Sequence, residues 1–241
     1  MLSLLLSLAL GILAGPIAHH LAVQAGADQP FAGEAAVCRR CGTRHGHLAT
    51  ACPFCTLGTG RVWLAAAVTG AVSGGVAWRL GTVWVLVGYL VFVFLTVVLF
   101  LTDIDHKRIP NRITYPGTPL AAMFLLGGAL LDGNGAGFLR ALLTALAYAG
   151  FFLLVYLAAR GGFGFGDVKL AVLLGLFLGY LGWDHLLVAG FVTAAVGGLM
   201  ALIAVVVGHA GAKTEIPYGP AMIVGAWVTI VGGQPLVDLL V

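Results

Sequence analysis

Three aspartates lie where long apolar runs meet polar connectors. Asp103 and Asp105 follow the apolar run from Val83 to Thr102, and Asp167 comes directly before the run that begins at Leu170. An ionisable group at the edge of a bilayer is expensive and indicates a functional site with a partner elsewhere. Residues two apart on a helix point about 200° away from each other, so Asp103 and Asp105 cannot both face one bundle interior.

Two aspartates, one from the 103–105 segment and Asp167, could act together as a general acid and a general base. Two carboxyls about 3 Å apart cannot both ionise easily and share one proton. The ionised member would take a proton from water attacking a peptide carbonyl, while the protonated member would hydrogen-bond the carbonyl oxygen. The alternatives are a solvated helix end for Asp105 and a simple N-cap for Asp167. No metal-binding spacing links His106, His185 and His209.

Four cysteines form a second candidate site in the polar stretch 24–61. Cys38 and Cys41 make one C-x2-C pair, Cys52 and Cys55 make another, and ten residues separate the pairs. Two such knuckles predict a tetrahedral Zn²⁺ site in which four thiolates close the coordination shell, so the metal is expected to be structural. Disulfide or redox chemistry and unliganded thiols are the alternatives.

The elements that must position these groups are membrane helices. With 61% hydrophobic residues, 9% charged residues and a mean hydropathy of +1.06, the chain has too little polar surface for a water-soluble globule. A spanning helix needs about 20 apolar residues. The sequence predicts an all-α, polytopic bundle of about eight spans, which are Leu2–Val23, Val62–Trp78, Val83–Thr102, Pro116–Leu131, Ala141–Ala159, Leu170–Trp183, His185–Gly208 and Tyr218–Leu236.

Basic residues give the bundle an orientation. Ten of the 12 basic residues lie in loops after odd-numbered spans, and only Arg79 and Arg140 lie in the others. The positive-inside rule then places the odd loops in the cytoplasm and both termini outside. The domains expected are a first transmembrane helix (1–23), a cytoplasmic four-cysteine zinc-binding loop (24–61) and a multi-helix membrane domain (62–241).

At these motifs the sequence resembles the type IV prepilin peptidase family, which are membrane aspartic proteases with a Gly-x-Gly-Asp motif. Asp103-Ile104-Asp105 with Pro110-Asn111 is similar to the family's D-x-D-x4-P-[DN] element, whose first acid is catalytic, and Gly164–Asp167 matches the second element. Ile216–Pro220 is similar to the I-P-[FY]-G-P stretch near the active-site mouth. The resemblance implies Asp103 and Asp167 as the catalytic pair and a substrate-binding set of Asp105, Gly164, Gly166, Pro217 and Gly219.

The resemblance also implies a reaction and its partners. The expected function is cleavage of short basic leaders from type IV pilin-like precursors at the cytoplasmic face of the bacterial plasma membrane, with membrane lipid as a further partner and no nucleic acid. Many family members also methylate the new N-terminus from S-adenosylmethionine. The loop here lacks the family's Asn-x-Pro and Tyr-Pro-x-x-Glu elements, so the sequence leaves that cofactor and activity open.

Two other classes of function compete with proteolysis. An ion-coupled membrane transporter would also use paired acids, but it would be expected to hold them near the bilayer midplane. An assembly scaffold would use the cysteine loop as a docking surface and would not need the aspartates. The position of the acids at span ends on one face favours the protease.

Overall fold

A computed structural model describes residues 1–26, 36–37, 44–45, 60–81, 83–158, 164–206 and 218–240. Eight α-helices and one short hairpin make up these ranges. The helices are α1 (Leu2–Gly26), α3 (Gly60–Leu80), α4 (Leu86–His106), α5 (Asn111–Leu131), α6 (Gly135–Ala158), α7 (Phe165–Leu181), α8 (Trp183–Val206) and α9 (Gly219–Leu240). The hairpin pairs β1 (Ala36–Val37) with β2 (Arg44–His45) in antiparallel register, a small addition to the expected all-α fold.

Six of these helices are long and apolar enough to cross a membrane: α1, α4, α5, α6, α8 and α9. The multi-pass prediction is confirmed in this form, while the expected number of about eight spans is supported only for six. Helix α7 has 17 residues, short for a full crossing. It is apolar on every side and largely buried by its neighbours, as an internal helix should be.

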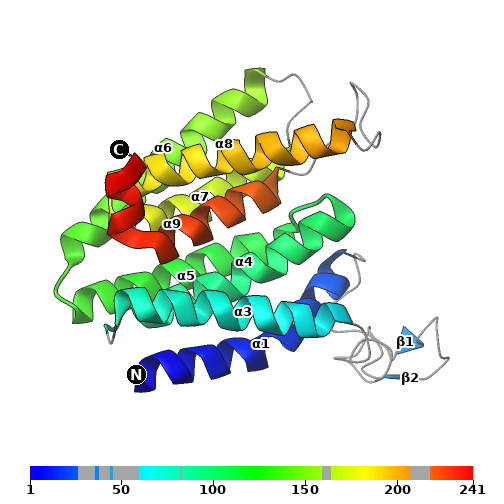
Figure 1. Cartoon of the computed structure of the whole chain (residues 1–241), viewed down its shortest axis with the longest axis horizontal. Coiled ribbons are helices and arrows are strands. Elements are labelled where there is room, and N and C mark those ends of the chain that lie inside the picture. The colour runs from blue at the N-terminus through cyan, green and yellow to red at the C-terminus, as the bar shows by residue number, and fades with distance from the viewer. Residues whose placement is uncertain are drawn as a thin grey trace.

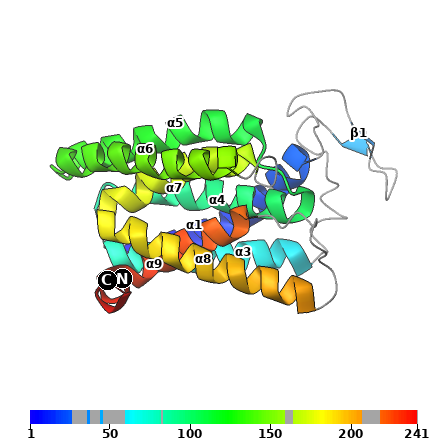
Figure 2. The ribbon, with the colours of Figure 1, turned by 90° about the horizontal axis from the view of Figure 1, so that it is seen from above.

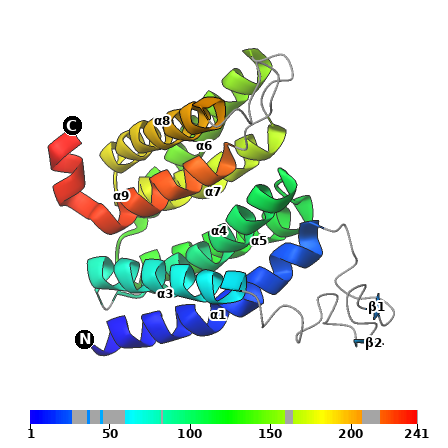
Figure 3. The same ribbon diagram turned by 45° about the vertical axis from the view of Figure 1, so that its right-hand side comes forward.

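The helices lie side by side in two layers (Figure 1). Figure 3 shows α1, α3, α4 and α5 in one layer and α6, α7, α8 and α9 in the other. Seen from above, α5 and α6 run along one edge of the bundle and α8 and α9 along the other (Figure 2). Helix α4 contacts α1, α3, α5, α7 and α9, so it runs through the middle of the bundle. Both termini lie at the same end of the bundle (Figure 1).

Aromatic rings set the register between α4 and α7. Phe92 stacks on Phe177 with ring centroids 4.5 Å apart, and Tyr89 meets Phe177 edge-on at 5.0 Å. Asp103 comes 11 residues after Phe92, and Asp167 comes 10 residues before Phe177. At about 1.5 Å per residue, the aspartates lie about 15–17 Å along their helices from this contact. Because the two helices run in opposite directions, both aspartates reach the same level of the bundle.

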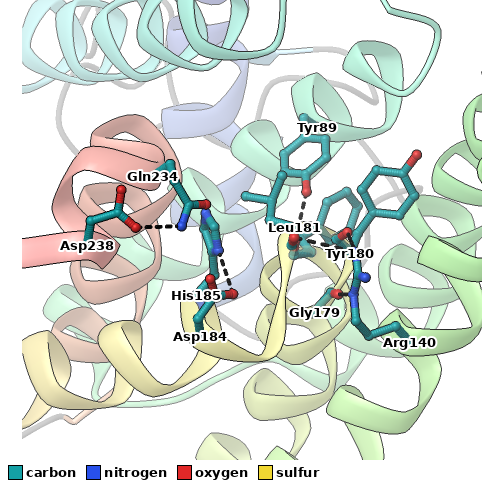
Figure 4. Close-up of polar contacts among 10 residues, drawn as sticks. Tyr89, Arg140, Gly179, Tyr180, Leu181, Asp184, His185, Gln234 and Asp238 are labelled. Atoms are coloured by element: carbon teal, nitrogen blue, oxygen red, sulfur yellow. Dashed lines mark hydrogen bonds and ion pairs between the residues drawn. The ribbon is translucent and has the colours of Figure 1, made fainter. Parts of the chain in front are cut away.

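Side chains from α4 and α6 hold the other end of α7 (Figure 4). Arg140 donates from Nε to the Gly179 carbonyl at 2.8 Å and from Nη2 to the Tyr180 carbonyl at 2.5 Å, and Tyr89 donates to the Phe177 carbonyl at 2.7 Å. The last carbonyls of a helix have no intrahelical partner, and a cation there complements the helix dipole. Helix α7 is therefore fixed at its C-terminus, away from Asp167.

A second group of polar side chains lies at this end of the bundle, on α8 and α9 (Figure 4). His185 Nδ1 lies 3.1 Å from Asp184 Oδ1, and Gln234 donates to Asp238 at 2.9 Å. Helix α9 kinks beside it, at Gly233 with φ of 58°, one residue before Gln234. His185 is buried in the first turn of α8.

Gly127 and Gly128 offer a matched test of packing on α5. A Cβ on residue 128 would lie 2.9 Å from the Trp84 carbonyl carbon and would collide with the Val85 backbone, whereas a Cβ on residue 127 would meet no atom within 4 Å. Overpacking of this kind costs about 1–3 kcal/mol. We expect Gly128→Ala to lower the thermal midpoint of the detergent-purified protein and Gly127→Ala to leave it unchanged. Equal losses in both variants would contradict the close contact.

Candidate active site

Asp103 lies in the last turn of α4 and is only 5% exposed. Helix α4 ends just beyond it because Lys107 adopts the left-handed conformation, with φ of 50°, and donates its backbone N–H to the Asp103 carbonyl at 2.8 Å. Within the described ranges, no hydrogen-bond partner reaches the buried Oδ2 of Asp103. A buried polar atom without a partner is costly and calls for a proton, a water or a ligand.

Asp167 lies in the first turn of α7 and is 8% exposed. The N-cap position belongs to Gly164, two residues before Gly166, so the alternative that Asp167 is a simple N-cap is wrong. Asp167 is instead the third residue of the helix, from which a carboxylate can reach back toward the N-cap, and a Cβ on residue 164 would lie 3.5 Å from Asp167 Oδ2. The helix thus fixes this carboxyl group at its N-terminus, where the dipole favours negative charge.

The two carboxyl groups lie close enough for their charges to interact. They come from opposite layers of the bundle, α4 and α7, and the register set by the aromatic rings brings them together. Like charges held close in a buried site favour a shared proton. Asp105 lies on the outer side of α4, exposed where Asp103 is buried, as helical phase predicts. Two buried carboxyls from different helices therefore lie at one end of the bundle.

Gly219, the first residue of α9, packs directly against Asp103. A Cβ on residue 219 would collide with Asp103 Oδ2. The Ile109 Cδ1 atom lies 3.4 Å from that Cβ position and 3.4 Å from the equivalent position on Gly166, so this side chain fills the space between the two glycines. Three motifs that are far apart in the sequence, around Asp103, Gly166 and Gly219, thus meet at one place. Pro217 lies outside the described residues.

Tyr218, next to Gly219, faces the second carboxyl group. Burial and the nearby charge of Asp167 raise the pKa of the Tyr218 phenol above its ordinary value. The phenol therefore stays protonated and remains a hydrogen-bond donor beside the pair. Sequence reasoning placed this stretch near the site but assigned no role to Tyr218.

Asp105 forms an ion pair with Arg61, in the first turn of α3. Asp105 belongs to the predicted substrate-binding set, and a cation of the leader would have to displace Arg61 to bind it. Arg61 and Asp105 are 44 residues apart in the sequence, which is why the sequence alone did not indicate the pairing.

Lys169 is a second residue that sequence reasoning missed. Its Nζ donates to Asn111 Oδ1 at 2.5 Å and lies 4.9 Å from the ring centroids of both Tyr115 and Phe165. Lys169 follows Asp167 by two residues, and Asn111 closes the motif that contains Asp103. These contacts join the start of α5 to the start of α7.

The four cysteines proposed as zinc ligands, Cys38, Cys41, Cys52 and Cys55, lie outside the described residues. Among the residues that are described, no group of three or more His, Cys, Asp or Glu side chains could hold a metal ion.

Comparison with known proteins finds similarity in the part of the chain that contains Asp103 and Asp167. A model of the type IV leader peptidase family matches residues 89–202. The chain is similar to proteins named prepilin leader peptidase/N-methyltransferase: it is 32% identical over 177 residues to one from Bacillus subtilis, covering 72% of this chain and 67% of that protein. The corresponding protein from Neisseria gonorrhoeae is 32% identical over 166 residues, covering 67% of this chain and 54% of that protein.

The protein of that name from Pseudomonas aeruginosa is 25% identical over 186 residues, covering 77% of this chain and 63% of that protein. The chain thus spans less than two thirds of the length of the Pseudomonas and Neisseria proteins. No solved structure matches it. The matched region of the family model contains both Asp103 and Asp167.

Proposed function

Because the chain belongs to the type IV leader peptidase family, we propose that it is a membrane aspartic endopeptidase that removes the leader from type IV prepilin-like precursors. The observation that carries this proposal is the meeting of Asp103 and Asp167, two buried and electrostatically interacting carboxyls, at facing ends of α4 and α7. Asp103 Oδ2, buried and without a partner among the described residues, is where a water or a peptide carbonyl would bind.

The reaction uses the pair as one base and one acid. The ionised carboxylate takes a proton from a water molecule as its oxygen attacks the scissile carbonyl carbon, and the protonated carboxyl gives its proton to the carbonyl oxygen. The tetrahedral intermediate then collapses, the C–N bond breaks, and a proton passes to the leaving amine. One peptide and one water become a carboxylic acid and an amine, and the pair ends with the single proton that it held at the start.

Glycines from the start of α7 and the start of α9 lie around the pair. Gly164, Gly166 and Gly219 present no side chains beside the carboxyls, and together with Pro217 they form the proposed binding surface for an extended segment of precursor. A peptide bond must be extended to be attacked, so the turn at Gly164 is expected to move when the substrate enters. Asp105 contributes to leader binding only if its partner Arg61 is displaced.

Charge distribution supports a cytoplasmic site. At the end of the bundle that holds Asp103 and Asp167, the basic residues of the described helices and turns are Arg61, Lys107, Arg108, Arg112 and Lys169. At the other end they are Arg79 and Arg140. Under the positive-inside rule, the end with more basic residues faces the cytoplasm. A precursor whose leader is cytoplasmic and whose apolar helix lies in lipid would then present its scissile bond at the level of the pair.

The proposed activity is tested with purified protein in detergent and a prepilin-like precursor containing its leader and apolar helix. We expect mass spectrometry to show one cut between the leader and the helix, without added metal. An intact precursor in the presence of folded protein would contradict the proposal. The same assay with isotope-labelled S-adenosylmethionine measures whether the new N-terminus is methylated.

We also propose that the four-cysteine loop binds one structural zinc ion. Four thiolates in two C-x2-C knuckles are a closed ligand set, and folding of so small a loop would depend on the metal. We expect elemental analysis to find one zinc per purified chain and a Cys38→Ser/Cys52→Ser variant to have lost it. A chain that contains no metal and two disulfides would show that the loop is oxidised instead.

A further inference from the structure

Each of the two carboxyls is followed, two residues later, by a charged residue on the same helix. Asp105 follows Asp103 in the last turn of α4, and Lys169 follows Asp167 in the first turn of α7. Positions two apart on a helix are about 200° apart around its axis. The charged residue therefore lies on the opposite side of the helix from the carboxyl.

On α4, the side opposite Asp103 contacts α3, a helix of the same layer. Asp105 forms its ion pair with Arg61 of α3. His19 of α1 is 7% exposed and lies close enough to interact electrostatically with both of these residues. The end of α4 is thus joined to α3 through a side chain about 200° around the helix from Asp103.

On α7, the opposite side is tied to α5. Lys169 donates to Asn111 Oδ1 at 2.5 Å, and its ammonium group lies between the rings of Tyr115 and Phe165. Gly164 and Gly166 precede it, so the backbone at the start of α7 has little intrinsic stiffness. Arg140 holds only the far end of this helix. Lys169 is therefore the charged contact that fixes the turn containing Asp167.

We propose that Asp105 and Lys169 are positioning residues that fix the rotation of α4 and α7 so that Asp103 and Asp167 face each other. Rotation of either helix by one residue, about 100°, would remove a carboxyl from the pair. A tether on the opposite side of each helix prevents that rotation. The test of this proposal by cleavage rate depends on the proposed peptidase activity. In this proposal Asp105 positions α4 and does not bind the leader.

Kinetics distinguish positioning from substrate binding. In Lys169→Met, which keeps the aliphatic stem and removes the ammonium, we expect kcat to fall roughly 10-fold or more with KM unchanged, because displacement of a reacting group by about 1 Å costs up to 100-fold. Lys169→Arg should restore most of the rate. Arg61→Asp and Asp105→Arg should each lower kcat, and the double variant should recover part of it.

A second measurement does not depend on activity. The chain has seven aspartates, so the carboxyl groups can be followed individually by NMR with 13C-labelled aspartate. Interacting carboxyls titrate as a coupled pair, and we expect this coupling between Asp103 and Asp167 to weaken in Lys169→Met and Asp105→Asn. Asp238→Asn, at the other end of the bundle, is the matched control and should leave the coupling unchanged. Thermal midpoints show whether each variant is folded.

Two outcomes would overturn the inference. A rise in KM with unchanged kcat would make these residues substrate contacts, and unchanged kcat together with unchanged coupling would leave them without a positioning role. In both cases cleavage by the wild type would keep the peptidase proposal intact. If the wild type does not cleave any precursor, the NMR coupling still decides whether Asp105 and Lys169 position the pair.

Discussion

Replacement of either buried carboxyl should abolish cleavage while leaving the protein folded. We expect Asp103→Asn and Asp167→Asn each to lower kcat by at least about 10³-fold, because an amide can neither take a proton from water nor return one to the carbonyl oxygen. Asparagine has nearly the shape of aspartic acid and removes an ionisable group from a buried site. The thermal midpoint should therefore be unchanged or higher. The measurement is single-turnover cleavage of a precursor by purified protein.

The double variant and a matched control make this prediction sharper. Residues that act as a unit are not additive, so Asp103→Asn/Asp167→Asn should be no slower than either single variant. Asp238→Asn makes the same chemical change at the other end of the bundle, beside Gln234, and should cleave at the wild-type rate. Cleavage that survives either active-site substitution would mean that the pair is not the acid and base.

Much of this site follows from local sequence signals. The apolar runs indicate the helices, and the abrupt appearance of Asp103 and Asp167 at their ends indicates groups that must have partners. The helical period places Asp103 and Asp105 on different sides of α4. In the structure Asp103 is buried, and Asp105 is exposed and forms an ion pair with Arg61. These inferences need only the period of one helix and the cost of burying charge.

The helix boundaries were harder to predict where proline or glycine occurs inside an apolar segment. Helix α5 begins at Asn111, five residues before the predicted start at Pro116. Pro116 and Pro119 therefore lie inside the helix and do not mark its beginning. Membrane helices tolerate such prolines when neighbouring groups satisfy the freed carbonyls. Helix α7 begins at Phe165, before the predicted Leu170, so Asp167 belongs to the helix and not to the turn before it.

Contacts between distant helices could not be read from the sequence. The pairing of Arg61 with Asp105 and of Lys169 with Asn111 joins positions 44 and 58 residues apart. No local pattern specifies which helix faces which, because the apolar surfaces of membrane helices are chemically alike. The register comes instead from close packing, such as the contact of Phe92 with Phe177.

Substitution of Gly219 should also lower the cleavage rate strongly, because the absence of a side chain at this position makes room for an oxygen of Asp103. A Cβ at this position would collide with Asp103 Oδ2, the buried oxygen that has no partner among the described residues. The φ of Gly219 does not lie in the left-handed region, so alanine fits its backbone and the penalty is steric. We expect Gly219→Ala to lower kcat about 100-fold, since a displacement of about 1 Å at the reacting centre is enough for that loss.

Gly190→Ala is the matched control for Gly219→Ala, because a Cβ on residue 190 of α8 would meet no atom within 4 Å. Its cleavage rate should equal that of the wild type, whereas Gly219→Ala should be slow even if its thermal midpoint is retained. In the Asp103→Asn background, Gly219→Ala should cause no further loss of rate, because the oxygen that it displaces no longer takes part in proton transfer. A fully active Gly219→Ala variant would mean that Asp103 reacts from a different position, with its side chain rotated away from α9.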